Sequence, residues 1–203
     1  MFGRVLLVTP IDNRDHSAFR YKVSEYEIPI LCSKDIVDKE HPLMDVGRYK
    51  FVENKHRYTV GSFTIMPLKV PHGDCPNFAY VIDHPSCGRI LFATDCEDFP
   101  YDIKDVTTLM IEANYSEEIL LRHALDGDDI RSHSETHMEI NRTLACIERL
   151  QSPKLRRVVL LHLSDGLSDE RAFIKAVRGV VGDFVEVYAA DKGMKIGLEK
   201  DWF

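Results

Sequence analysis

The stretch that most constrains the fold of this chain runs from residue 63 to residue 98 and contains His72 and Asp95. It holds three short apolar runs, separated by residues typical of loops and turns: 63–70, 78–82 and 89–93. Such runs are typical of buried strands. His72 and Asp95 therefore follow strand ends, where rigid elements often position functional side chains. A loop histidine on its own is more often solvated than functional. Whether His72 has a functional role therefore depends on the residues found elsewhere in the chain.

Two further apolar runs, 5–8 and 158–161, also lead into side chains that bind metals. The ligand-type residues after the four strand ends are Asp12, Asp15 and His16, then His72, Asp95 and His162. Carboxylate oxygens and neutral imidazoles suit Zn²⁺, and also Mn²⁺ or Fe. A carboxylate between imidazole clusters can bridge two ions about 3.5–4 Å apart. A compatible interpretation of the first loop is that Asp15 or Ser17 caps a helix.

The remaining sequence alternates between predicted strands and helices. Strands are predicted at 107–115 and 185–189, and helices at 116–125, 139–150 and 169–180. Residues 49–55 and 57–58 alternate polar and apolar side chains, which suggests an antiparallel pair at a sheet edge. Glu112 and Asn114 end a strand; they could reach the site, but we interpret them as caps of the helix that follows. This alternation of strands and helices predicts an α/β fold.

Composition excludes several classes of protein. The chain has 203 residues, 44% of them hydrophobic, enough for one large domain with a real core. Its formal net charge of -7 excludes a general electrostatic grip on nucleic acid, although a local patch could bind a phosphodiester. The five scattered cysteines indicate reduced thiols. No signal-peptide pattern or membrane-spanning run is present, so we expect a cytoplasmic protein without a membrane partner.

In this order, the motifs resemble those of the metallo-β-lactamase-fold hydrolases, and especially a small cytosolic branch similar to ribonuclease Z and related phosphodiesterases and nucleases. That family has a strand leading to T-H-x-H-x-D-H, then a loop histidine, a bridging aspartate and a late histidine. The matching segments are Thr9 with Asp15-His16-Ser17, Val70-Pro71-His72-Gly73-Asp74, Ala93-Thr94-Asp95 and Leu160-Leu161-His162-Leu163-Ser164. Segments 111–115, 136–138 and 191–194 are also similar to that branch, so the resemblance covers nearly the whole chain.

The resemblance implies a single α/β domain over residues 1–203, an αββα sandwich of two mixed sheets packed face to face with helices outside. The family usually has several strands before its first metal motif, whereas that motif comes almost at once here. We therefore expect N-terminal strands that are reduced or missing, or a chain that is a fragment. An unpaired sheet edge favours association with another chain, so a homodimer is one expected arrangement.

The resemblance also implies a metal centre in which Asp12, Asp15, His16, His72, Asp95 and His162 are the candidate ligands. The first motif departs from the family, because Pro10 and Asp12 stand where the family has two histidines and one extra residue precedes Asp15. Asp12 can still ligate, whereas Pro10 cannot. We predict one tightly bound zinc or manganese ion and a second ion that is weak or absent.

Asp15 and His137 are the candidate catalytic residues. His137 resembles a histidine that donates a proton near the leaving group in ribonuclease-like members; the alternative is a packed helix-end histidine. We predict a metal-dependent phosphodiesterase or nuclease that acts on nucleic acid or a nucleotide through a metal-activated water. The alternatives are a metallohydrolase of another ester, thioester or lactam, and a non-catalytic binding protein with a degenerate site.

Overall fold

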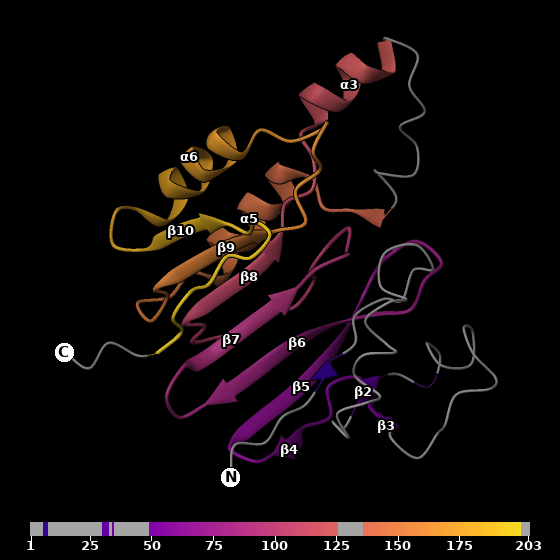
Figure 1. The fold of residues 1–203 in the computed structure, drawn as a ribbon, viewed down its shortest axis with the longest axis vertical. Coiled ribbons are helices and arrows are strands. Elements are labelled where there is room, and N and C mark those ends of the chain that lie inside the picture. The colour runs from indigo at the N-terminus through magenta and orange to yellow at the C-terminus, as the bar shows by residue number, and fades with distance from the viewer. Residues whose placement is uncertain (1–5, 8–29, 33, 35–48, 126–135, 200–203) are drawn as a thin grey trace.

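The computed structural model describes residues 6–7, 30–32, 34, 49–125 and 136–199 of the chain. A seven-stranded sheet forms its centre, in the order β10-β9-β8-β7-β6-β5-β4 (Figure 1). Its strands are β4 (Tyr58–Val60), β5 (Phe63–Val70), β6 (Asn77–His84), β7 (Gly88–Ala93), β8 (Thr108–Glu112), β9 (Arg157–Leu161) and β10 (Glu186–Ala189). A second sheet has three short parallel strands, β1 (Leu6–Leu7), β2 (Ile30–Cys32) and β3 (Tyr49–Phe51).

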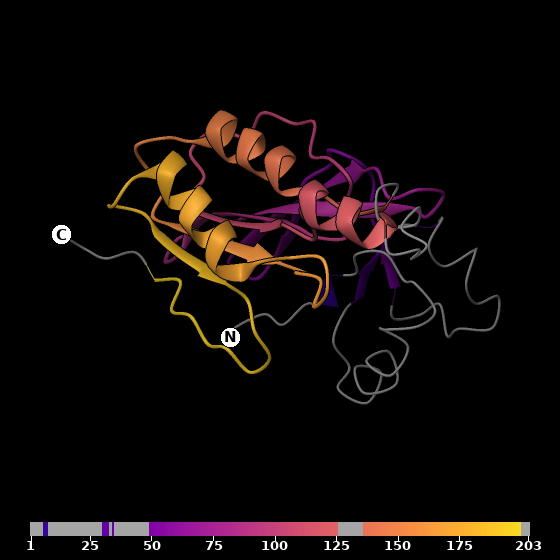
Figure 2. The same ribbon diagram turned by 90° about the horizontal axis from the view of Figure 1, so that it is seen from above.

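Three described helices, α3 (Glu117–Leu125), α5 (Ile140–Leu150) and α6 (Glu170–Val181), follow later strands. Figure 2 shows α5 and α6 side by side on one face of the large sheet. α5 forms because its buried residues recur at helical spacing: Ile140, Thr143, Ile147 and Leu150. The N-cap of α6 is Asp169, whose carboxylate accepts a hydrogen bond from the backbone N–H of Ala172 at 3.0 Å.

Side chains of the large sheet alternate between two hydrophobic cores. Leu91, Leu109 and Leu160 belong to the core that includes residues of α5 and α6. On β5 and β6, Ile65 and Tyr80 belong to a second core that also contains Leu31 of the small sheet. Because successive residues of a strand point to opposite faces, these cores lie on opposite sides of the large sheet. The predicted α/β fold, with a large central sheet, a second sheet and helices, is therefore confirmed. The prediction of two mixed sheets is not met by the described strands of the small sheet, which are all parallel.

Five strands of the large sheet run in the same direction, since β10 also pairs in parallel with β9. β7, β8 and β9 are parallel neighbours, and β5 is antiparallel to β6, which is antiparallel to β7. The C-terminal ends of β5, β7, β8 and β9 therefore meet at one edge of the sheet. This arrangement gathers the polar residues that follow those four strands.

One sequence prediction about the sheets is wrong. Residues 49–55 and 57–58 do not pair with each other: β3 pairs in parallel with β2, whereas β4 pairs antiparallel with β5. Polar-apolar alternation reports which face a residue occupies, and it does not identify the partner strand. Separately, none of the helices in the described ranges is long and apolar enough to cross a bilayer.

Candidate metal centre

Three ligand-type side chains converge at the edge where the parallel strands end. Asp95 follows β7, His162 follows β9, and His137 lies just before α5. One potential ligand atom from each of these residues lies within 4.8 Å of the others. The ring of His72, which follows β5, has its centroid 5.5 Å from that of His137. The strand directions thus bring His72, Asp95 and His162 to one edge, where His137 joins them from the segment before α5. His72 is not one of the three residues whose ligand atoms lie within 4.8 Å.

Two of these residues have an unusual backbone conformation. Asp95 and His162 adopt φ angles of +52° and +55°. Non-glycine residues in the left-handed region cost on the order of 1–3 kcal/mol, and they persist where surrounding contacts fix them. Such strain collects at functional sites, so its presence at two residues of one cluster supports a functional role for this edge.

A buried asparagine supports the backbone of each left-handed residue. The Asn77 amide donates to the carbonyl of Thr94 at 3.0 Å and also to that of Asp95. The Asn114 amide donates to the carbonyl of His162 at 2.7 Å. The Oδ1 atoms of both asparagines are buried without a hydrogen-bond partner in the described structure. In each asparagine, the side-chain N–H groups hold the backbone of a cluster residue, while the side-chain oxygen stays unpaired at a cost in free energy.

The segment that carries His137 is attached to the extension of β8. The backbone N–H of Asn114 donates to the carbonyl of Met138 at 2.9 Å, and that of Ile140 donates to the carbonyl of Tyr115 at 2.9 Å. These bonds place His137 beside the end of β8, although 24 residues separate it from Ala113 in the sequence. His137 therefore reaches the site from outside the sheet.

Glu112, the last residue of β8, lies within hydrogen-bond distance of both His137 and His162. Its side chain is fully buried, and its Oε1 atom lies 2.7 Å from Nδ1 of His137 and 3.2 Å from Nδ1 of His162. Its Oε2 atom accepts the backbone N–H of Cys96 at 2.5 Å. Burial alone would raise the pKa of Glu112, but the hydrogen bonds from both histidines and from Cys96 outweigh it and lower this pKa. Glu112 is therefore a carboxylate that orients two imidazoles.

His72 is oriented in a different way. Its Nδ1 atom lies 2.7 Å from the carbonyl oxygen of Thr136, which can only accept a hydrogen bond. His72 therefore carries a proton on Nδ1, which leaves Nε2 as the nitrogen with a lone pair when the ring is neutral. A carbonyl or carboxylate behind Nδ1 is the usual support of a histidine that binds metal.

The donor set fits a divalent metal ion. Two imidazoles and a carboxylate match the preferences of Zn²⁺, Mn²⁺ and Fe. The side chains of Asp95, His137 and His162 are 13%, 19% and 40% exposed, so an ion could reach them from solvent. Cys96 is fully buried nearby, and burial raises the pKa of its thiol well above the usual value. Within the described residues, the Cys96 sulfur is not among the ligand atoms that converge with those of Asp95, His137 and His162.

Sequence reasoning found part of this cluster. His72, Asp95 and His162 lie at one edge, as the strand-end argument predicted. Asp12, Asp15 and His16 lie outside the described residues. The interpretation of Glu112 and Asn114 as caps of the next helix is wrong, since they bond to His137 and His162 instead. One feature of the sequence could have indicated the role of Glu112: it ends a strand that lies, along the chain, between the strands leading to Asp95 and His162.

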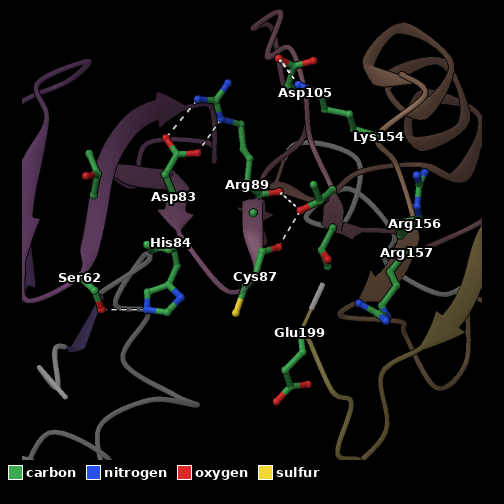
Figure 3. Close-up of a pocket in the computed structure, with 15 residues that line it drawn as sticks. Ser62, Asp83, His84, Cys87, Arg89, Asp105, Lys154, Arg156, Arg157 and Glu199 are labelled. Carbon is green, nitrogen blue, oxygen red and sulfur yellow. Dashed lines mark hydrogen bonds and ion pairs between the residues drawn. The ribbon is translucent and has the colours of Figure 1, made fainter. Parts of the chain in front are cut away.

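A hollow of about 750 Å³ lies at the opposite end of the sheet, lined by residues that end β6 and begin β7, β8 and β9 (Figure 3). Ser62 Oγ lies 2.8 Å from Nε2 of His84, but Nδ1 of His84 accepts the backbone N–H of Ser86 at 3.2 Å. The proton of the neutral ring is therefore on Nε2, and His84 donates to Ser62. This tautomer cannot act as a base toward Ser62, so the pair is not an activated nucleophile.

The basic residues of this hollow are largely neutralised by carboxylates. Arg89 pairs with Asp83 through two hydrogen bonds of 2.8 and 3.1 Å. Two further ion pairs of this kind join Lys154 to Asp105 at 3.0 Å and Arg157 to Glu186 at 2.6 Å. Figure 3 shows the pairs of Arg89 and Lys154. Most of the basic groups of this hollow are therefore paired with carboxylates, and His84 does not activate Ser62 as a nucleophile.

A family model described as the β-lactamase superfamily domain matches residues 15–163 of the chain. The chain belongs to this superfamily. The match spans the strands that carry His72 and Asp95 and ends just after His162, so it covers the edge described above. A search of curated proteins found no match.

Solved structures show the same fold. The metallo-β-lactamase-fold protein YhfI from Bacillus subtilis is 19% identical with a TM-score of 0.67, over 94% of this chain and 76% of that one. A diphosphatase of the PhnP family is 14% identical with a TM-score of 0.52, over 79% and 55% of the two chains. CmlA, a diiron β-hydroxylase from Streptomyces venezuelae, is 14% identical with a TM-score of 0.61, over 91% and 43%. This chain thus spans about half the length of the diphosphatase and less than half the length of CmlA.

Proposed function

We propose that this protein is a metal-dependent hydrolase of phosphodiesters, in nucleic acid or in a nucleotide. The observation that carries the proposal is the convergence of Asp95, His137 and His162 within 4.8 Å at the edge where the parallel strands end. Membership of the β-lactamase superfamily supports a hydrolytic reaction at this edge. The metal identity we favour is zinc or manganese, because imidazole and carboxylate suit both.

A divalent ion held here would polarise a phosphoryl oxygen and lower the pKa of a bound water. The residues of the chain provide the fixed frame for that chemistry. Asp95 and His162 are presented by strand ends, and their backbone carbonyls are held by Asn77 and Asn114. Glu112 fixes the imidazole of His162 through Nδ1. A site held in this way is preorganised, so little rearrangement is needed when substrate binds.

The preference for phosphodiesters has two supports. Segments around Glu112, His137 and Lys192 resemble ribonuclease Z-like phosphodiesterases and nucleases, and one structure of the same fold is described as a diphosphatase. The fold also hosts other reactions, so esters, thioesters and lactams are the competing substrate classes. A non-catalytic binding protein is the second candidate function, which the loss of a first-motif histidine at Pro10 favours.

The test is a panel of phosphodiester, thioester and lactam substrates, assayed with protein loaded with Zn²⁺ or Mn²⁺. We expect hydrolysis of a phosphodiester such as bis(p-nitrophenyl) phosphate, and its loss in Asp95→Asn. Asparagine also tolerates the left-handed conformation, so this variant should keep its fold. His84→Gln, at the opposite end of the sheet, is the matched control and should keep full activity. Hydrolysis of a thioester or lactam alone would overturn the substrate class, and turnover of none would favour the binding protein.

A further inference from the structure

His137 and His162 are held by the same atom. Oε1 of Glu112 lies within hydrogen-bond distance of Nδ1 of both imidazoles, at 2.7 and 3.2 Å. Their ring centroids are 4.8 Å apart, with the rings at 70° to each other. One buried oxygen therefore orients the two histidines as a pair. A carboxylate on Nδ1 directs any metal bond to Nε2, which is the arrangement found behind metal-binding histidines.

The separation of the donor atoms also fits a shared ion. Metal bonds to nitrogen and oxygen of about 2.0–2.2 Å place ligands of one ion up to roughly 4.4 Å apart. The potential ligand atoms of Asp95, His137 and His162 lie within 4.8 Å of one another, close to this limit.

The position of His137 is also fixed by the backbone around it. His137 lies in a segment pinned to the end of β8 by the hydrogen bonds from Asn114 and Ile140. That anchoring puts its imidazole beside His162, on the same side as Asp95, and its side chain is only 19% exposed.

We propose that His137 is a ligand of the metal ion and does not serve as the proton donor. The inference rests on the proposed metal-dependent function and deepens it. The ion would then be held by two histidines that Glu112 orients and by the carboxylate of Asp95. This ligand set replaces the sequence-based hypothesis that His137 protonates the leaving group.

The test compares metal binding in the full-length wild type, His137→Ala, His137→Gln and His84→Gln. Zinc affinity is measured by competition with a chromophoric chelator, and the coordination geometry by the visible spectrum of the Co²⁺-substituted protein. Loss of a supporting residue typically costs 10–100-fold in affinity, so loss of a ligand should weaken zinc binding by about 100-fold or more. Both His137 variants should also change the Co²⁺ spectrum. His84→Gln should match the wild type in affinity and spectrum.

A proton donor would behave differently. Its removal would leave zinc affinity and the Co²⁺ spectrum unchanged while turnover fell by about 10²–10⁴-fold, and that result would overturn the inference. Wild-type protein that binds no metal would instead reject the proposed function. If the His137 variants do not fold, long-range ¹H–¹⁵N spectra of the wild type test whether His137 binds zinc. Ligation should shift the Nε2 resonance of His137 when zinc is added. An unshifted resonance in zinc-loaded protein would contradict ligation.

Discussion

At the scale of single residues, the candidate metal centre depends on polar groups that have little solvent contact. Glu112 is fully buried and accepts hydrogen bonds from His137, His162 and the backbone of Cys96. A buried carboxylate is stable only when its oxygens are paired in this way. The orientation of both imidazoles is therefore tied to the stability of the fold at this point.

Glu112→Gln should weaken both stability and metal binding. The glutamine amide keeps the shape of the side chain but brings N–H groups toward neighbours that also donate, so at least one buried donor loses its acceptor. We expect the free energy of unfolding to fall by about 1–3 kcal/mol, measured by urea denaturation of metal-free protein. Zinc affinity should fall about 10–100-fold.

The control for this prediction is Glu118→Gln on α3. Glu118 pairs with Arg122 one helical turn away, and its side chain is 74% exposed. An exposed pair of this kind contributes little, so neither stability nor zinc affinity should change measurably. Equal stability and equal affinity for Glu112→Gln and the wild type would show that Glu112 does not orient the histidines.

The sequence could place some of these residues and not others. His72, Asp95 and His162 follow apolar runs, so their positions at strand ends could be predicted from local pattern alone. The contact between Glu112 and His137 could not, because it depends on hydrogen bonds between Asn114 and Met138 that no local pattern reports. The roles of Asp12, Asp15 and His16 stay predictions.

At the scale of elements, the start of α5 links helix stability to the site. Its N-cap, Glu139, accepts a hydrogen bond from the backbone N–H of Asn141 at 2.6 Å, and it lies two residues after His137. The N-cap of α6, Asp169, makes an equivalent bond to Ala172 at 3.0 Å, but α6 follows the loop after His162 and carries no residue of the cluster. The two caps therefore form a matched pair.

Glu139→Ala and Asp169→Ala should each lower the free energy of unfolding by about 0.5–2 kcal/mol. Glu139→Ala should also weaken zinc binding, because the cap fixes the segment that presents His137. Asp169→Ala should leave zinc affinity at the wild-type value. Thermal melting and chelator competition on the two variants measure these effects. Equal zinc affinity in both would indicate that the α5 cap has no influence on His137.

Local pattern predicted most elements of the large sheet and the three described helices to within about one residue at their N-terminal ends. Apolar runs became β5, β6, β7 and β9, and apolar spacing identified α5. Strand pairing was harder, since β3 and β4 were predicted as partners and belong to different sheets. Pairing is set by contacts distant in sequence, which alternation does not encode.

At the scale of the whole molecule, the large sheet has two different polar environments at its opposite ends. The edge where β5, β7, β8 and β9 end carries the candidate metal centre, and the opposite end carries the hollow with its paired charges. The alternation of strands and helices predicted the α/β class, whereas the packing of two sheets face to face followed only from the family resemblance. Membership of the β-lactamase superfamily is consistent with both.

The central claim is that this chain holds one metal ion tightly at the edge formed by Asp95, His137 and His162. Elemental analysis of wild-type protein and Asp95→Asn after exhaustive dialysis tests it most directly, followed by titration with Mn²⁺. We predict one zinc or manganese ion per wild-type chain, a marked loss in Asp95→Asn, and any second ion only during the titration. No bound metal in the wild type, or two ions that survive dialysis, would contradict the account.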